Sequence, residues 1–464
     1  MKILTIKEIF KKKTLINKKI FIKGWVHTRR DSKKGFSFLN IYDGSCINSI
    51  QIIVNNKIKN YKKDVLKLTT GCSVSVIGII INSIGREQNI EIKAYSIKVI
   101  GWINNPETYP ISSKKHSMNF LRKFSHLRPR SRIIGSVSRI RHTLSYEIHN
   151  FMNKNGFYWI STPLITSLDT EGSGNMFNIS TLNENNISYK DKNLIKNNFF
   201  GKESFLTVSG QLNAESYACA LSKVYTFGPT FRAEKSNTRR HLSEFWMIEP
   251  EIAFVSLNEI ILFAENMLKY LVTSILNQRE DEINFFSKYW KIDLIYRLNK
   301  FINDKFIQIE YSEVIKILQK NYKLFNKNIR WGEDLFSEHE RFLSEKYFNS
   351  TIIIKNFPKN IKAFYMRLND DNKTVASLDI ISPGIGEIVG GSQREERLDF
   401  LDKQINSFKL CKKNYWWYRD LRRYGTVPHS GFGLGLERLI MTITGIKNIR
   451  DTIPFPRTPY NINF

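Results

Sequence analysis

A charged pair in the segment from Phe231 to Phe254 limits most strongly what this chain can fold into. Arg232 and Glu234 stand two residues apart, so both side chains point to the same side wherever the chain is extended. The stretch from Lys235 to Arg240 is too polar to be buried, and Phe245 to Phe254 has the composition of a returning strand. We therefore expect a hairpin that brings charge to a ligand, with a structural ion pair as the alternative.

The net charge of the chain points to a polyanionic partner. Lys and Arg total 71 against 43 Asp and Glu, which gives +28 over 464 residues. A field of this size attracts nucleic acid. The alternative explanation is background composition, because Lys, Ile and Asn are abundant throughout, as an AT-rich genome would produce.

Cysteine usage and hydropathy bear on where the protein works. The four cysteines include no Cys-x-x-Cys pair, which argues against a zinc site or a disulfide framework and indicates a reducing, cytoplasmic compartment. The longest apolar run is too short to cross a bilayer. We expect a protein that does not enter a membrane.

The first 103 residues predict a small β-barrel. Five short alternating runs follow one another there, as in an OB-fold. Within one run Phe36 and Phe38 share a face and alternate with Ser37 and Leu39. Aromatic side chains beside basic residues such as Arg29 can stack unpaired bases. Burial of both phenylalanines in the core is the alternative.

The rest of the chain predicts an α+β domain with a mainly antiparallel sheet flanked by helices. Apolar residues repeat at helical spacing from Ser131, and a strand is expected from Gly156 to about Pro163. Strands and helices do not alternate as βαβ units further on. We expect strands over 351–355, 363–368, 375–381 and 387–390, a helix over 256–277, and domain limits of 1–103, 104–128 (a hinge) and 129–464.

Two further segments carry residues suited to a nucleotide. The string over 431–439 is GxGxG, so neither a dinucleotide fingerprint nor a phosphate-binding P-loop is supported. Arg438 follows these glycines and is a candidate phosphate ligand. Asp379 and Glu387 flank a Pro-Gly turn and offer the oxygen ligands that Mg²⁺ requires. A surface arginine and a surface acid pair are the alternatives.

These segments together resemble the class II aminoacyl-tRNA synthetases. GFYWISTPLIT looks like motif 1, FRAEKSNTRRHLSEF like motif 2 and GFGLGLERL like motif 3. Motifs 2 and 3 after an OB-like barrel are typical of the aspartate, asparagine and lysine subgroup. Within it, VSGQLNAESYACALSKVYTFGPTFRAE and GIGEIVGGSQREER are similar to asparaginyl-tRNA synthetases of bacterial type, and the similarity runs nearly from end to end.

The resemblance implies a reaction and its partners. Such an enzyme activates L-asparagine with ATP to asparaginyl-adenylate and pyrophosphate, and then transfers asparagine to the 3' end of tRNA(Asn). It uses Mg²⁺ and works as a homodimer with motif 1 at the interface. By resemblance, ATP is bound by Arg232, Glu234, His241, Phe245, Glu387 and Arg438, of which Arg232 and Arg438 are catalytic, and the metal by Asp379 and Glu387.

The resemblance also assigns the amino acid and the anticodon. Ala214 stands where aspartate enzymes have a lysine for the substrate carboxylate, and Asp379 and Glu387 lie one residue further apart than in those enzymes. Glu171 belongs to a loop that closes over the amino acid, with Gly172 and Gly174 as its glycines. The remaining assignments are Gln211 and Glu249 for the α-amino group, Glu215 for the amide nitrogen, Arg394 for the amide oxygen, and Arg29, Phe36, Phe38 and Gln51 for anticodon bases.

Three other functions stay open at this point. One is an aspartyl-tRNA synthetase, including one that charges both tRNAs, although the missing lysine at Ala214 counts against it. Another is an ammonia-dependent asparagine synthetase, which would have no use for an anticodon-binding barrel. The third is a non-catalytic RNA-binding relative, against which the presence of Arg232, Glu387 and Arg438 argues.

Overall fold

The computed structural model forms two compact units. It describes residues 2–83, 85, 88–171, 175–181, 198–236 and 238–464. One unit comprises Met1–Ser138 with Phe464, and the other Arg139–Asn463. The division falls inside helix α3 (Arg132–Lys154), and the domain limits expected from the sequence stay a prediction.

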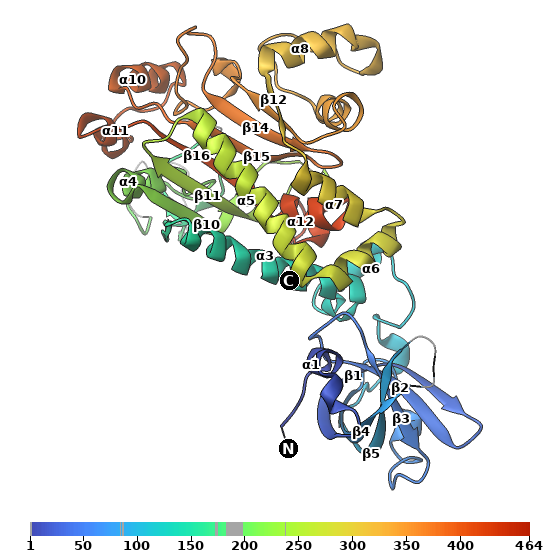
Figure 1. Ribbon diagram of the computed structural model, residues 1–464. Helices are drawn as coiled ribbons and strands as arrows, with labels where there is room; N and C mark the ends of the chain where they lie inside the picture. The colour runs from blue at the N-terminus through green and yellow to red at the C-terminus, as the bar shows by residue number, and fades with distance from the viewer. Residues whose placement is uncertain (1, 84, 86–87, 172–174, 182–197, 237) are drawn as a thin grey trace. The chain divides into compact units, whose positions relative to one another are not determined.

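The first unit contains the expected five-stranded barrel (Figure 1), closed in the order β1-β2-β3-β5-β4. Alternating side chains fill its interior. In β2, for example, every second residue is buried, beginning with Ser37. The inward side chains form one apolar core that includes Leu39, Ile41 and Ile52. The strands are β1 (Lys19–Ser32), β2 (Phe36–Tyr42), β3 (Ile50–Asn55), β4 (Ser73–Asn82) and β5 (Ile90–Gly101), with α1 (Ile6–Lys11) before them and α2 (Met118–Lys123) after them.

The second unit is built on an eight-stranded sheet in the order β12-β13-β14-β15-β16-β11-β10-β6. Neighbours pair antiparallel except for β12 with β13 and β10 with β6. This confirms the mainly antiparallel α+β prediction. The strands are β6 (Tyr158–Trp159), β10 (Lys223–Phe231), β11 (Glu244–Ala253), β12 (Ile307–Glu310), β13 (Ile352–Lys355), β14 (Ser377–Ser382), β15 (Gly386–Gln393) and β16 (His429–Gly435); β7 (Ile165–Thr166), β8 (Asn178–Ile179) and β9 (Ser204–Leu206) form a small separate sheet.

Helices cover the large sheet, and capping groups mark the start of one of them and the end of another. Helix α5 packs along β14, β15 and β16, and α12 packs on β11 and β16 (Figure 1). The backbone N–H of Ser256 donates to Glu259 at 2.7 Å at the start of α5, and α12 ends at Gly445, whose φ of 71° suits glycine. The other helices are α4 (Gln211–Leu221), α5 (Leu257–Gln278), α6 (Glu280–Trp290), α7 (Leu294–Asn303), α8 (Tyr311–Lys320), α9 (Ser337–Arg341), α10 (Leu398–Ser407), α11 (Trp416–Arg423) and α12 (Leu436–Thr444).

Two strand predictions are wrong. The segment 363–368 forms only isolated bridges, at Met366 and Leu368, instead of a strand. The segment from Gly156 to Pro163 contributes only the two residues of β6. Both segments have the composition of strands, but only a few of their residues pair with another segment, which composition does not reveal.

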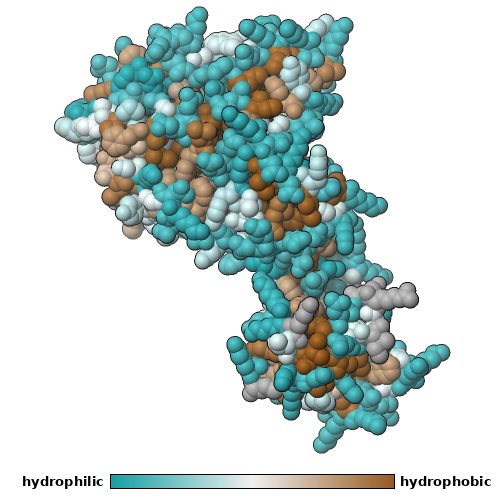
Figure 2. Space-filling view, viewed as in Figure 1, coloured by the Kyte–Doolittle hydropathy of each residue, from teal (hydrophilic) through white to brown (hydrophobic). Residues whose placement is uncertain are grey.

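Hydrophilic side chains dominate the visible face of the molecule, with apolar groups scattered between them (Figure 2). Of the helices that the structure describes, none combines the length and the apolar composition needed to cross a bilayer.

Candidate active site

The hairpin predicted around Arg232 is present. Strands β10 and β11 pair from Lys223 with Ile252 to Phe231 with Glu244. Arg232 and Glu234, however, follow the end of β10 and lie in the connecting segment. The backbone N–H of Arg232 still donates to the carbonyl of Ser243 at 2.9 Å. The connection therefore carries the charged pair at the end of the ladder, where a ligand can reach it.

A cavity opens at this end of the hairpin and extends over β15 and β16. All six residues that the resemblance assigns to ATP line it: Arg232, Glu234, His241, Phe245, Glu387 and Arg438. Met247 and Gly433 lie on its floor. The structure thus brings together side chains that are up to about two hundred residues apart in the chain.

Arg232 is the central cation of this cavity. One of its terminal nitrogens, Nη2, donates to Oε1 of Glu171 at 2.6 Å, and its guanidinium lies 5.5 Å from the ring centroid of Phe245. Its Nε is buried and has no hydrogen-bond partner among the described residues. A buried donor without a partner carries a desolvation cost. Gly172 and Gly174, the predicted loop glycines beside Glu171, lie outside the described residues.

Arg438 and Glu387 face each other across the same cavity. The Nη1 of Arg438 donates to the Glu387 carbonyl at 2.8 Å and to its Oε2 at 3.3 Å. The Glu387 side chain remains 40% exposed. Partial removal from water acts to raise the pKa of Glu387, but Arg438, Lys362 and Arg232 outweigh this and lower it. Glu387 is therefore an ionised and accessible carboxylate.

A β-bulge brings Asp379 and Glu387 to one face of the sheet. Asp379 pairs with Gly390, whereas Ile381 pairs with Glu387, so β15 carries one extra residue between these pairs. In continuous register Glu387 would oppose Ser382 and point to the other face. A Cβ added at Gly390 would lie 2.9 Å from Glu387 Oε1 and 3.7 Å from Asp379 Oδ1. The bulge therefore lets these two acids lie on the same face of the sheet.

Lys362 is a residue of this site that the sequence analysis missed. Its Nζ donates to both carboxylate oxygens of Asp379, at 2.8 and 2.7 Å. Lys362 follows a short 3₁₀ turn in an irregular segment, so no periodicity places it in the site. Removal from water raises the pKa of Asp379 to about 6, against the opposing effect of Lys362.

A second cavity of about 660 Å³ adjoins the first. The two share Arg232, Met247, Glu387 and Gly433. Acids and three cations surround the second cavity together with the aromatic rings of Tyr365 and Phe432. Its charged residues are Glu171, Glu249, Glu251, Asp334, Asp379 and Glu387 with Arg232, Lys362 and Arg394, and Gln211 also lines it.

Glu249 and Gln211 are held at one side of the second cavity. The Glu249 carboxylate accepts from the Ser209 hydroxyl, from the Gly210 N–H at 3.0 Å and from the Thr226 hydroxyl at 2.8 Å. Gln211 is oriented by the donation of its Nε2 to Glu215 at 3.0 Å. Both predicted α-amino ligands are therefore fixed before a substrate arrives.

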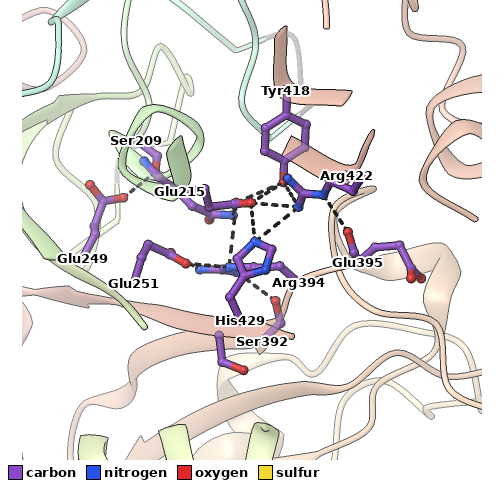
Figure 3. Close-up of polar contacts among 12 residues, drawn as sticks. Ser209, Glu215, Glu249, Glu251, Ser392, Arg394, Glu395, Tyr418, Arg422 and His429 are labelled. Carbon is purple, nitrogen blue, oxygen red and sulfur yellow. Dashed lines mark hydrogen bonds and ion pairs between the residues drawn. The ribbon is translucent and has the colours of Figure 1, made fainter. Parts of the chain in front are cut away.

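Arg394 is clamped by Glu251 across β16 (Figure 3). Its Nε and Nη2 donate to the two Glu251 oxygens at 3.2 and 2.5 Å, and its Nη1 donates to Ser392 at 2.8 Å. Glu251 and Ser392 stand on either side of Gly431 in adjacent strands. A Cβ at Gly431 would collide with the Glu251 carboxylate. This glycine therefore leaves room for the ion pair.

The prediction that Glu215 accepts directly from a substrate amide does not fit the structure. Glu215 is fully buried and is absent from the cavity lining. Burial opposes its charge, but Arg422, His429 and Arg394 outweigh this and keep the pKa of Glu215 well below its usual range. The carboxylate accepts from Tyr418 at 3.0 and 2.8 Å and Arg422 at 2.8 Å, and lies 2.9 Å from His429 Nε2 and 4.0 Å from Arg394 Nε (Figure 3).

Comparison with known proteins identifies the family. The family description "tRNA synthetases class II (D, K and N)" matches residues 117–459, and "OB-fold nucleic acid binding domain" matches residues 20–100. The chain is 59% identical over 465 residues to asparagine--tRNA ligase of Histophilus somni and 57% identical over 466 residues to that of Photorhabdus laumondii, in both cases over 100% of each chain. This chain belongs to the asparagine--tRNA ligase family of class II tRNA synthetases.

Solved structures agree with this membership. Asparaginyl-tRNA synthetase from Pyrococcus horikoshii complexed with asparaginyl-adenylate superposes with a TM-score of 0.88 at 33% identity, over 100% of this chain and 99% of that one. The Entamoeba histolytica asparaginyl-tRNA synthetase, also with asparaginyl-adenylate, gives 0.83 at 26% identity, over 97% of each chain. Aspartyl tRNA synthetase from the same organism shares the fold at 24% identity.

The OB barrel of this family member presents an aromatic face on β2. Phe36 and Phe38 alternate with the buried Ser37 and Leu39, as the sequence predicts, and their rings meet edge to face at 5.1 Å. Both rings are partly exposed. Gln51 of β3 shares this face, because its cross-strand partner is Asn40.

Arg29 does not share that face. A register shift between Val26 and Thr28 places Arg29 opposite the buried Leu39, and its Nη1 donates to the carbonyls of Val65 and Leu68 at 3.2 and 2.9 Å. The neighbouring Arg30 pairs with Phe38 and is exposed. The structure therefore places Arg30, and not Arg29, on the face of Phe38, since the shift inverts the face of every later residue in β1.

Glu340 of α9 is a further acid beside the first cavity. Its Oε2 accepts from Arg240 Nη1 at 3.1 Å, and a Cβ at Gly386 would collide with the same oxygen. Removal from water and the charge of Glu387 raise the pKa of Glu340 to about 7, against the effect of Arg240. Glu340 thus carries a proton at pH values where an exposed glutamate does not.

We expect Glu340→Gln to remove a pH dependence of stability. Between the ordinary pKa of 4.5 and pH 7 the folded protein holds a proton on Glu340 that the unfolded chain releases. The wild-type free energy of unfolding therefore falls, relative to that of the variant, as the pH rises through this window, by roughly 1.4 kcal/mol for each unit of pKa shift. Denaturant titrations of both proteins at several pH values measure it. A difference that stays constant with pH contradicts the assignment.

Proposed function

We propose that the protein activates L-asparagine with ATP, forming asparaginyl-adenylate and pyrophosphate, and then transfers asparagine to the 3' end of tRNA(Asn). The observation that carries this proposal is a pair of adjoining cavities that share Arg232 and Glu387. One cavity offers cations and an aromatic ring to a nucleotide, and the other offers fixed polar groups to a small amino acid. The α-phosphorus and the carboxylate of the amino acid would then meet at Arg232.

The activation step needs positioning and charge neutralisation more than proton transfer. The asparagine carboxylate is already ionised when it attacks the α-phosphorus and pyrophosphate leaves. Arg232 would hold the α-phosphate and the attacking carboxylate, and Arg438 would hold the γ-phosphate. Fixed donors aimed at developing charge lower the barrier without reorganisation. Phe245 would stack on adenine, with Glu234 and His241 holding the rest of the nucleotide.

Mg²⁺ is expected with ATP, and the donor set at Glu387 fits it. This carboxylate is 40% exposed and lies where the two cavities meet, as oxygen ligation of Mg²⁺ beside phosphates requires. Bound there, the ion would neutralise phosphate charge in the transition state. Asp379 is less available, because both of its oxygens accept from Lys362.

The second cavity suits the α-amino group and the side chain of asparagine at different walls. Glu249 and the Oε1 of Gln211 would accept from the ammonium group, and Glu171 would cover it. Arg394 would donate to the side-chain carbonyl. Its orientation is preset by Glu251 and Ser392, so little ordering is required on binding.

Discrimination against aspartate would follow from the charge already balanced behind Arg394. Glu251 lies in contact with Arg394, and Glu215 lies 4.0 Å from its Nε, so no uncompensated cation awaits a second carboxylate. An aspartate side chain would therefore be buried as an uncompensated carboxylate, which costs about 3 to 5 kcal/mol. That energy corresponds to about a thousandfold in rate or affinity. Arg394 in this setting favours the neutral amide.

The barrel would read the anticodon of tRNA(Asn). Phe36 and Phe38 give a stacking surface, Gln51 a hydrogen-bonding group and Arg30 a cation on the same face. The net charge of +28 would add attraction to the phosphates. The free thiols and the partnership with tRNA fit a cytoplasmic enzyme.

A homodimer would form through the β6 edge of the large sheet. Tyr158 and Trp159 of β6 are 60% and 54% exposed, and Tyr146 of α3 is 60% exposed. β6 is the last strand in the order, so its outer edge offers unpaired backbone groups. Large exposed aromatic groups beside an open edge are typical of an association surface.

The reaction is tested by amino-acid-dependent exchange of pyrophosphate into ATP. We expect exchange with asparagine and on the order of a thousandfold lower kcat/KM with aspartate. Charging of tRNA(Asn) but not tRNA(Asp) transcripts measures the second step. Equal exchange with both amino acids would indicate an aspartyl or relaxed enzyme, and no exchange with either would indicate a non-catalytic RNA-binding protein.

Anticodon recognition is tested by Phe38→Ala. Loss of one stacked base costs about 1 to 3 kcal/mol, so the KM for tRNA(Asn) should rise roughly fivefold to a hundredfold. Pyrophosphate exchange without tRNA should not change. Tyr95→Ala is the matched control, since Tyr95 is an exposed aromatic residue on another barrel strand. If both variants weaken tRNA charging equally, Phe38 has no specific role.

Dimerisation is tested by Trp159→Lys. A charge buried at the proposed interface should convert a particle of twice 54.5 kDa into the 54.5 kDa chain in sedimentation. Tyr296→Lys is the control, because Tyr296 is 67% exposed on α7 and should leave the mass unchanged. A Trp159→Lys protein that keeps the wild-type mass argues against this surface.

A further inference from the structure

Lys362 and Asp379 form an ion pair that is largely shielded from water. The ammonium donates to both carboxylate oxygens at 2.8 and 2.7 Å, and the two side chains are only 15% and 16% exposed. Opening such a pair leaves an uncompensated charge in a poorly hydrated place, which is strongly unfavourable. The pair is therefore a fixed part of the wall of the second cavity, which both residues line.

A second contact holds the lysine in place. Its ammonium lies 3.9 Å from the ring centroid of Phe357, and that ring is 2% exposed. Cation–π attraction is strongest at desolvated rings of this kind. Phe357 on one side and Asp379 on the other leave the flexible lysine side chain little freedom. Lys362 thus differs from a surface lysine that forms an incidental contact.

The ammonium of Lys362 acts on both acids that are predicted to bind the metal, Asp379 and Glu387. The bulge in β15 puts Asp379 and Glu387 on one face, with Gly390 between them. The charge of Lys362 also acts on Glu387, where it helps to lower the pKa. One cation, which belongs to the chain itself, therefore already stabilises the negative charge of both acids.

The two acids differ in how available they are to a divalent ion. Mg²⁺ requires oxygen ligands at 2.0–2.1 Å in near-octahedral geometry. To use Asp379 it would have to displace an ammonium from both carboxylate oxygens, whereas the Glu387 side chain is 40% exposed. The donor set thus fits a metal at Glu387 and disfavours one at Asp379.

We propose that the ammonium of Lys362 takes the place of a second divalent ion at Asp379, and that metal bound with ATP is held through Glu387. This inference rests on the proposed function, since it concerns the ATP complex. It makes Lys362 a positioning residue that supplies a fixed point charge to Asp379. The chain would need fewer divalent ions for activation than its acids suggest.

The test counts Mn²⁺ bound to the full-length protein with ATP and without amino acid, by electron paramagnetic resonance of free Mn²⁺. Lys362→Met should bind one more Mn²⁺ per chain than the wild type, because Asp379 becomes available. The double variant Lys362→Met/Asp379→Asn should lose that extra ion. Lys359→Met, an exposed lysine three residues away, should match the wild type.

The single variant Asp379→Asn completes the design. If Asp379 ligates no metal in the wild type, this variant keeps the wild-type number of Mn²⁺ ions. A lower number in Asp379→Asn, or no extra ion in Lys362→Met, overturns the proposal. A protein that binds no Mn²⁺ with ATP contradicts the proposed function as well, so the two failures are distinct. Circular dichroism of each variant confirms that the counted protein is folded.

Discussion

The ion pair between Arg394 and Glu251 is the interaction on which the amino-acid end of the site depends. It spans β16 from the strands on either side and passes over Gly431, which has no side chain to block it. Both residues of such a buried pair are required, because removing either one leaves the other as an uncompensated buried charge. The strand order, the glycine and the two charged residues therefore depend on one another, and none of them can be replaced without affecting the others.

Charge balance distinguishes the two ends of the site. At the Arg394 end, Arg394 forms a hydrogen bond with Glu251 and Arg422 forms one with Glu215. The charges therefore cancel, and the pocket offers oriented hydrogen-bond donors without a net charge. Arg232 and Arg438 instead line an open cavity and are 32% and 28% exposed. A neutral amide suits the first environment and a triphosphate suits the second. The same residue types therefore serve opposite purposes according to how completely they are paired.

Much of the fold could be predicted from the sequence, because alternation in β2 and helical spacing in α3 and α5 report burial directly. Five of the six residues assigned to ATP could be singled out because motifs 2 and 3 carry them as local strings, and the sixth, Glu387, stands in the separate string GIGEIVGGSQREER. The surroundings of Arg29 and Glu215 could not be predicted from the sequence. A register shift turned one away from Phe38, and Tyr418 and Arg422, some two hundred residues downstream, enclosed the other. Lys362 lies in an irregular segment, where no periodicity indicates a face, and only its contact with Asp379 reveals it.

The single extra residue in β15 has a consequence for comparing chains of this group. A bulge restores the alternation of side chains after an insertion. It lets a strand gain one residue while the side chains beyond it stay on the same faces of the sheet. Two chains whose acids are seven or eight residues apart can therefore present the same pair of carboxylates. Aligning such chains residue by residue through this strand, without a gap opposite Ile388, would equate a side chain on one surface with a side chain on the other.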